Sequence, residues 1–379
     1  MASTVEILEW LVRHDTVSAN SNLPLVDELE RFLTKIGARV TRLSDPHEPK
    51  AGLYAEVGPP GPGIVLSAHT DVVPVEGQSW TTAPFQLSGK DDKLYGRGTT
   101  DMKGFLAAML SLASRANISE MQEPIKLVIS YDEEIGCVGI AQMLDRLRLL
   151  IGAPRLAIVG EPTEMQVATG HKGKQAFVAH VLGEAGHSAL APRFVNAVNV
   201  AADFVQELQR LQIELEANVS QDLAYDIPYS TIHVGRIQGG RALNMVPEKA
   251  EVTFEVRHLP KDDPDALRLR LEDLAKNTSA RHGETSRIKL KMITAYPGLE
   301  TDPTSRAARL VQKLAKTNFT KVAFGTEAGF FEHLGVPTLV CGPGSMEGQG
   351  HKADEYITKG QLSACDAMLD RVLMQLHSD

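Results

Sequence analysis

Short apolar runs and amphipathic stretches alternate along the first part of the chain. The apolar runs are rich in β-branched residues, as buried strands are, and lie at residues 64–68, 125–130 and 156–159. The amphipathic stretches carry apolar residues at helical spacing and lie at residues 24–36, 105–113 and 141–150. Strands that alternate with helices favour an α/β domain with a mostly parallel central sheet and helices on both faces.

The pattern changes after about residue 173. Half-exposed strand-like segments, with apolar and polar residues in alternation, are mixed with helical stretches at residues 195–208 and 265–274. The alternation of apolar runs with amphipathic stretches returns at about residue 306. We therefore expect a main domain made of residues 1–172 and 291–379, with a smaller α+β domain inserted at residues 173–290.

Composition narrows the class of partner. The chain has 379 residues, more than one hydrophobic core usually serves, and a formal net charge of −9. This charge argues against nucleic acid or an anionic membrane, since both attract basic surfaces. No apolar run approaches the roughly 20 residues that span a bilayer, and residues 1–16 predict an amphipathic helix instead of a signal peptide. Three scattered cysteines fit a reducing compartment. We expect a cytoplasmic protein that acts on a small molecule.

Acidic and imidazole side chains follow several of the predicted strands or begin a helix. They are His69, Asp71, Asp101, Glu133, Glu134, Glu161 and, much later in the chain, His351. Because ligands of open α/β sheets bind beyond the carboxyl ends of the strands, we expect these groups to converge. Carboxylates and imidazoles at one dry site repel each other unless cations lie between them. The sequence therefore predicts a pair of divalent metal ions and, with them, a hydrolase.

Five of these residues divide into ligands for two ions. Asp101, at the start of a helical stretch, is expected to bridge both ions. His69 and Glu161 complete the first ligand set, and Glu134 and His351 complete the second. Each ion then has three protein ligands and an open position, as a catalytic zinc requires, and cobalt and manganese tolerate the same ligands.

Two further acidic residues are expected to work beside the ions. Asp71 lies two residues after His69 and is expected to fix the tautomer of that imidazole through its other ring nitrogen. Glu133 is adjacent to a ligand and is the predicted general base for an attacking water. Taken alone, a His-x-Asp pair is more often a capping or surface pair, and adjacent glutamates usually begin a solvated helix. The order and placement of the whole set favour the metal site.

Several motifs of the chain resemble one enzyme superfamily along essentially its whole length. They lie at residues 67–74, 95–104, 132–134, 186–188 and 244–247. The chain is similar there to the metallo-aminoacylase and metallo-carboxypeptidase superfamily. Residues 325–331 and 341–356 look most like its acetylornithine deacetylase branch, because desuccinylases more typically carry Gly-Thr-Ser-Asp-Gly where this chain has Gly-Thr-Glu-Ala-Gly. An extra glycine at residues 347–350 departs from the pattern before His351.

The resemblance implies a reaction and an assembly. The reaction is hydrolysis of Nα-acetyl-L-ornithine to ornithine and acetate, a step of arginine biosynthesis, with two divalent ions, most often zinc. It also implies that the inserted domain forms a homodimer, and that His187 reaches the partner subunit's site to stabilise the oxyanion. A cis peptide bond between Asp101 and Met102 is implied as well.

Substrate contacts are implied at five positions. Asn244 and Arg257 are similar to residues that contact substrate in the superfamily. Gly325 and Thr326, with the guanidinium fork of Arg257, are plausible contacts for the substrate carboxylate. Glu327 either faces the cationic amine of the substrate or is a helix-start carboxylate, and the sequence favours neither.

Two alternatives stay open. A desuccinylase or a broader aminoacylase would keep the chemistry and change the substrate, and a desuccinylase needs extra cationic groups for the succinyl carboxylate. A non-catalytic metal-binding or scaffold protein would keep the fold alone. Glu133 beside a complete ligand set argues against a scaffold, which has no use for a base.

Overall fold

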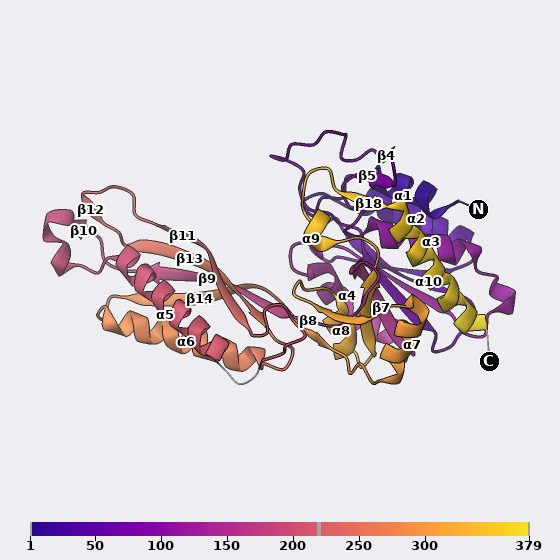
Figure 1. Ribbon diagram of the computed structural model, residues 1–379. Helices are drawn as coiled ribbons and strands as arrows, with labels where there is room; N and C mark the ends of the chain where they lie inside the picture. The colour runs from indigo at the N-terminus through magenta and orange to yellow at the C-terminus, as the bar shows by residue number, and fades with distance from the viewer. Residues whose placement is uncertain (1, 218–220, 378–379) are drawn as a thin grey trace. The chain divides into compact units, whose positions relative to one another are not determined.

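The computed structural model describes residues 2–217 and 221–377, and these form two compact units (Figure 1). Unit 1 consists of Met1–Gly170, Leu299–Val322 and Thr326–Asp379, and unit 2 of His171–Gly298 and Ala323–Gly325. Unit 2 is thus inserted in sequence between two parts of unit 1. Among the described residues, no helix combines the length and apolarity needed to cross a bilayer.

Unit 1 is built on a sheet of nine strands within the described residues. In chain order the strands are β1 (Arg39–Ser44), β2 (Ala51–Val57), β3 (Ile64–His69), β6 (Ile125–Ser130), β7 (Leu156–Pro162), β8 (Val167–His171), β15 (Leu299–Glu300), β16 (Phe319–Val322) and β17 (Thr338–Gly342). Their order across the sheet is β1-β2-β6-β3-β7-β17-β8-β15, and β16 pairs with β8. The four central strands β6, β3, β7 and β17 run parallel. The predicted α/β fold with a mostly parallel centre is confirmed.

Helices cover this sheet. They are α1 (Thr4–Val12), α2 (Leu23–Lys35), α3 (Lys103–Arg115), α4 (Val138–Ile151), α7 (Arg306–Ala315), α8 (Ala328–His333), α9 (Met346–Gln349) and α10 (Lys359–His377), with the 3-10 turn η1 (Ile118–Glu120). Helix α3 is buried from Lys103 to Ala113 because it packs against α1, α10 and β3. A small sheet of β4 (Ser88–Lys90), β5 (Lys93–Tyr95) and β18 (Tyr356–Thr358) completes the unit. Strands β3 and β6 are buried at every residue, which is why their sequences are continuous apolar runs.

Unit 2 is an α+β layer. Its sheet has the order β11-β13-β9-β14, all antiparallel, with β9 (Gly173–Leu182), β11 (Thr231–Gly239), β13 (Lys249–His258) and β14 (Arg287–Tyr296). Helices α5 (Ala197–Ala217) and α6 (Pro264–Arg281) pack on this sheet. Aromatic rings fill the core: Phe177 stacks on Phe254 at 5.3 Å between centroids, and Phe204 meets Phe254 edge-on at 5.9 Å. The short strands β10 (Gly186–His187) and β12 (Met245–Val246) pair with each other, and η2 (Ser188–Arg193) follows β10.

Strand β14 crosses the domain boundary that the sequence suggested at residue 290. It pairs with β9 along its length, so unit 2 continues to Gly298. A register shift between Met292 and Thr294 breaks the alternation of apolar and polar residues in this strand. The strand is also largely exposed, with Lys289 and Lys291 open to solvent, so its sequence carried little of a strand's signal.

Candidate metal centre

The five predicted metal ligands lie together in unit 1. His69 is the last residue of β3, Glu161 lies near the end of β7, and Glu134 follows β6. Asp101 precedes α3, and His351 lies in the loop between α9 and β18. The parallel strands thus present their ligands from one edge of the sheet, as the sequence suggested. The peptide bond between Asp101 and Met102 is cis, which confirms the expectation from the resemblance.

Asp101 stands between two imidazoles, with one carboxylate oxygen toward each. Its Oδ1 lies 3.2 Å from Nε2 of His69, and its Oδ2 lies 3.4 Å from Nε2 of His351. Glu161 Oε1 lies 3.8 Å from the same nitrogen of His69, and Glu134 Oε2 lies 3.0 Å from that of His351. The five side chains therefore form two groups of three that share Asp101.

The second ring nitrogen of His69 is held by Asp71. Nδ1 of His69 lies 2.9 Å from the main-chain oxygen of Asp71 and 3.4 Å from its carboxylate. Both of these groups accept hydrogen bonds, so the proton is assigned to Nδ1 and the lone pair to Nε2. The lone pair then points at Asp101 and Glu161, which is the orientation that a metal ligand needs.

The carboxylate of Asp71 also orders the loop that carries the two glutamates. It accepts hydrogen bonds from the amides of Glu133 at 3.1 Å and Glu134 at 3.2 Å, and from the hydroxyl of Ser18 at 2.7 Å. The residue before the two glutamates, Asp132, has a φ of +54° and forms a buried ion pair with Lys50, whose Nζ lies 2.5 and 2.7 Å from its two oxygens. Fixed backbone on both sides therefore sets where the two glutamates point.

Three glutamates of the site have raised pKa values. Burial raises the pKa of Glu133 to about 7 and that of Glu134 to about 8, and it raises the pKa of Glu161 well above its usual range; the nearby Asp101 adds to each shift. Burial would also raise the pKa of Asp101, but His351 and His69 hold it below its usual range. The protein alone thus brings more negative charge together than its imidazoles balance.

These residues fit a pair of divalent cations. Oε1 of Glu161 is buried and has no hydrogen-bond partner, although it lies near the lone pair of His69. Ligand atoms of His69, Asp101 and Glu134 lie within 4.8 Å of one another, as do those of His69, Glu133 and Glu161. Imidazole nitrogens and carboxylate oxygens are the ligands of zinc, and bound cations would favour the charged carboxylates and lower their pKa values again.

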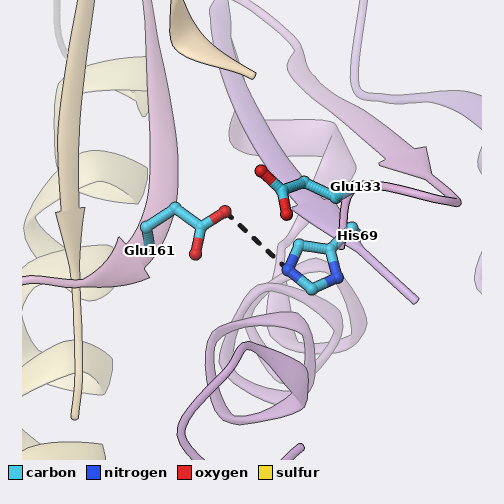
Figure 2. A group of neighbouring side chains, drawn as sticks. All are labelled: His69, Glu133 and Glu161. Carbon is cyan, nitrogen blue, oxygen red and sulfur yellow. Dashed lines mark ion pairs between the residues drawn. The ribbon is translucent and has the colours of Figure 1, made fainter. Parts of the chain in front are cut away.

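Glu133 faces the same space as the ligands. In Figure 2 the carboxylates of Glu133 and Glu161 both point toward the imidazole of His69. One oxygen of Glu133 accepts a hydrogen bond from the thiol of Cys137 at 3.2 Å. Glu161 forms an ion pair with His69 (dashed in Figure 2), and its Oε1 has no hydrogen-bond partner. Among the described residues, Glu133 has neither an ion pair with His69 nor a buried oxygen without a partner. Of these two glutamates, Glu161 thus has the contacts better suited to a metal ligand.

His187 and Asn244 lie at one end of unit 2. Strand β10 places His187 opposite Met245 of β12, and the amide of Ser188 donates to the main-chain oxygen of Asn244 at 3.1 Å. His187 and Asn244 are both exposed. The fold thus brings together two residues that are far apart in the sequence and that the resemblance singled out.

Arg257 and Gly325 meet through Tyr296, also in unit 2. The guanidinium Nη1 of Arg257 donates to the hydroxyl of Tyr296 at 2.8 Å, and its Nε donates to Glu255 at 2.9 Å. A Cβ atom at Gly325 would lie 2.1 Å from the Tyr296 ring, so only glycine permits this approach.

Thr326 and Glu327 are buried in unit 1 at the start of α8. The hydroxyl of Thr326 accepts a hydrogen bond from the amide of Ala328 at 3.0 Å. Glu327 makes no capping hydrogen bond, and its Oε1 is buried without a partner. Burial raises the pKa of Glu327 to about 7. Glu327 thus stands at the start of α8, as one of the two alternatives expected, but its side chain does not cap the helix.

Sequence reasoning missed the residues that hold the site in place. They are Ser18, Lys50, Asp132, Cys137 and Tyr296. Asp132 stands directly before the two glutamates, and Cys137 stands four residues after Glu133. Their closeness to this motif in the sequence could have identified both residues. Ser18 and Lys50 reach the site, and Tyr296 reaches Arg257 and Gly325, only through the fold.

Comparison with known proteins gives the family. Residues 65–375 match the family described as Peptidase family M20/M25/M40. This chain belongs to that family. The resemblance is thereby confirmed, and so is the expectation of a hydrolase that acts on an amide bond.

Curated relatives match over nearly the whole chain. An acetylornithine deacetylase of Buchnera aphidicola is 30% identical over 361 residues, which cover 94% of this chain and 93% of the relative. An acetylornithine deacetylase of Salmonella arizonae is 33% identical over 360 residues, with coverage of 93% and 92%.

Solved structures share the fold at low sequence identity. A metallo-carboxypeptidase of the M20 family from Sulfolobus solfataricus superimposes with a TM-score of 0.82 at 19% identity, covering 100% of this chain and 99% of that chain. The YXEP protein of Bacillus subtilis, a dinuclear metal-binding peptidase of the same family, has a TM-score of 0.71 at 16% identity, with coverage of 99% and 98%.

Proposed function

We propose that this chain removes the acetyl group from Nα-acetyl-L-ornithine by hydrolysis, giving ornithine and acetate. The single observation that carries the chemistry is Asp101, which offers one oxygen to the group around His69 and the other to the group around His351. The substrate follows from the relatives named acetylornithine deacetylase, which match more than nine-tenths of the chain.

Two divalent cations are held by the two groups of ligands in this proposal. Asp101 is shared, His69 and Glu161 serve one cation, and Glu134 and His351 serve the other. Zinc suits these ligands, and cobalt or manganese is an acceptable substitute. When bound, the cations polarise the amide carbonyl and lower the pKa of water.

Glu133 moves the proton. Its carboxylate takes a proton from the attacking water and returns it to the leaving amine, which requires a pKa near the working pH. Burial raises the pKa of Glu133 and bound cations would lower it, so the two effects oppose each other at this carboxylate. The thiol of Cys137 fixes one oxygen of Glu133, so the other is left to face the water.

His187 stabilises the oxyanion from the partner subunit of a homodimer. Unit 2 leaves unit 1 at His171 and returns at Gly298, beside the first residues of β9. His187 follows the far end of β9, a strand of 10 residues, so it lies roughly 30 Å from that connection at about 3.3 Å per residue. All metal ligands are in unit 1, and this separation supports a contribution to another subunit's site.

The substrate carboxylate is bound by Arg257, with Gly325 and Thr326 shaping the surroundings, and Asn244, which lies beside His187, would reach the substrate from the partner subunit. Tyr296 and Glu255 orient the guanidinium of Arg257. Glu327 recognises the cationic end of the ornithine side chain. The unpartnered buried oxygen of Glu327 supports this role, because a buried carboxylate gains from a cationic partner.

The proposed setting is the cytoplasm, where the product ornithine would enter arginine biosynthesis. Three buried free cysteines are consistent with a reducing compartment. The alternative substrates are succinylated or other acylated amino acids. A desuccinylase requires a cationic group for the second carboxylate, and an acetyl-specific pocket does not.

The test is product release from a panel of substrates by the metal-loaded enzyme. Nα-acetyl-L-ornithine should release acetate with the highest kcat/KM, and a succinylated amino acid should release little succinate. Glu327→Gln should raise KM for acetylornithine and spare N-acetyl-L-norvaline, which has the same carbon chain without the amine. Equal turnover of the succinyl substrate would overturn the proposed specificity, and an equal loss on both acetyl substrates would overturn the role of Glu327.

A further inference from the structure

His351 is the proposed ligand with the least support from regular structure. Its side chain is 51% exposed, its φ is +62°, and it lies in a loop that contains an extra glycine. The two carboxylates at its ring are themselves proposed metal ligands. These ring contacts do not explain how the backbone of His351 is held in place.

A buried ion pair ties Asp101 to the chain segment that follows His351. Arg97 and Glu355 are each about 1% exposed, and Nη1 of Arg97 lies 2.7 Å from Oε2 of Glu355. Oε2 of Glu355 also accepts from the amide of Gly98 at 2.9 Å. Oε1 accepts from the amides of Thr100 at 2.8 Å and Asp101 at 3.1 Å. One carboxylate thus fixes the backbone that presents the shared ligand.

Gln78 connects this ion pair to His351 itself. Its Oε1 accepts from Nη2 of Arg97 at 2.5 Å and from the indole of Trp80 at 3.1 Å. Its Nε2 donates to the main-chain oxygen of His351 at 2.9 Å. Two donors on one side of the amide require its oxygen there, so the orientation of Gln78 is determined.

We infer that Gln78 is a positioning residue for His351, and that Gln78, Arg97 and Glu355 close a hydrogen-bonded ring that sets the distance between His351 and Asp101. This inference rests on the proposed two-cation site. Residues that orient ligands typically change metal affinity by about 10–100-fold when they are lost. Loss of Gln78 should therefore weaken the cation at Asp101, Glu134 and His351, and spare the cation at His69 and Glu161.

Substitutions at Gln78 separate the two halves of its contacts. Gln78→Met removes both the acceptor and the donor. Gln78→Glu keeps an acceptor for Arg97 and Trp80 but cannot donate to the carbonyl of His351. The matched control is Gln221→Met in unit 2, which also removes a bond from a glutamine Nε2 to a main-chain oxygen, that of Glu216 at 3.0 Å.

The experiment is a titration of the metal-stripped full chain with Zn²⁺ against a chromophoric chelator. Wild type and Gln221→Met should bind two ions. Both Gln78 variants should bind one ion as wild type does and the other about 10–100-fold more weakly. In a His351→Ala background, which lacks the affected site, Gln78→Met should add nothing.

Three results separate the possible failures. Wild-type affinities for both ions in the Gln78→Glu variant would overturn the inference, and so would an undiminished effect of Gln78→Met in the His351→Ala background. Fewer than two ions in wild type would overturn the proposed site itself. Because Gln78→Glu retains the pairing with Arg97, a folding defect confined to Gln78→Met would leave this test intact.

Discussion

The two units bury their sheets in different ways. In unit 1, strands β3, β6 and β17 are buried at every residue, with helices covering the sheet. In unit 2, α5 and α6 pack on the sheet, but β11 and β14 at its two edges remain largely exposed. A sheet buried on both faces offers rigid strand ends for a reactive site. A sheet with open edges offers backbone groups and side chains to a partner.

Chemistry follows this difference. Every proposed metal ligand and the proposed base lie in unit 1, at strand ends or in nearby loops, and Asp71 and the Lys50–Asp132 ion pair fix the backbone around the two glutamates. His187 and Asn244 lie exposed at the distal end of unit 2. The comparison agrees with the proposal that unit 1 carries the reacting centre and that unit 2 contributes His187 to a partner subunit.

The largest expected effect is on unit 1 chemistry. Glu133→Gln keeps the size of the side chain and removes the group that moves the proton. We expect kcat to fall by about 10²–10⁴-fold, the usual contribution of general acid–base catalysis, with both cations retained. Steady-state kinetics and metal analysis of the same preparation measure both quantities. Activity within a few-fold of wild type would show that the base lies elsewhere.

The shared ligand should be distinguishable from an unshared one. Asp101→Ala removes an oxygen from both cation sites, so occupancy of both should drop together. His351→Ala should mainly empty one site. Metal content of the two purified variants decides this, and an undiminished two-ion stoichiometry in Asp101→Ala would contradict the assignment of Asp101.

Metal removal should destabilise the units unequally. Cations that bind only the folded form stabilise it by about 2.7 kcal/mol at 100 times the dissociation constant. Chelation should therefore lower the unfolding temperature of unit 1 and leave the unfolding temperature of unit 2 unchanged. Calorimetry can assign the unit 2 transition with Phe254→Ala, which opens the core of that unit. A chelator-induced shift in the transition that responds to Phe254→Ala would contradict the division.

Acid should act on unit 2 through His171, with the smallest effect. Burial lowers the pKa of His171 to about 4, whereas an unfolded imidazole titrates near 6.5. Between these values the unfolded chain binds the extra proton, so stability is complete above pH 6.5 and falls as pH drops toward 4. The loss should be on the order of 2 kcal/mol between pH 7 and pH 5.

Two variants test the source of this acid sensitivity. His171→Gln should flatten the dependence of the unfolding free energy of unit 2 on pH. His180→Gln, at a partly exposed position on β9 of unit 2, should leave it unchanged. Equal slopes in wild type and His171→Gln would show that other groups are responsible.

The sequence was informative where burial is complete. Strand β6 has the predicted bounds because both of its faces are covered, and the ligands were found because they follow such strands. Strand β14 was missed because a bulge and the exposed lysines interrupt the alternation of apolar and polar residues that is typical of a strand. The partners of the site, such as Ser18 for Asp71 and Lys50 for Asp132, lie far away in sequence and carry no local pattern. Those pairings depend on the folded chain alone.

The most direct test of this division of work mixes two inactive variants. His187→Ala lacks the unit 2 contribution, and Glu133→Gln lacks the unit 1 contribution. In a mixed dimer, one of the two sites combines an intact Glu133 with the intact His187 of the other chain. Random exchange makes half of the dimers mixed, so activity should recover to about a quarter of wild type in a symmetric dimer. No recovery, with exchange demonstrated, would contradict a His187 that serves the partner's site.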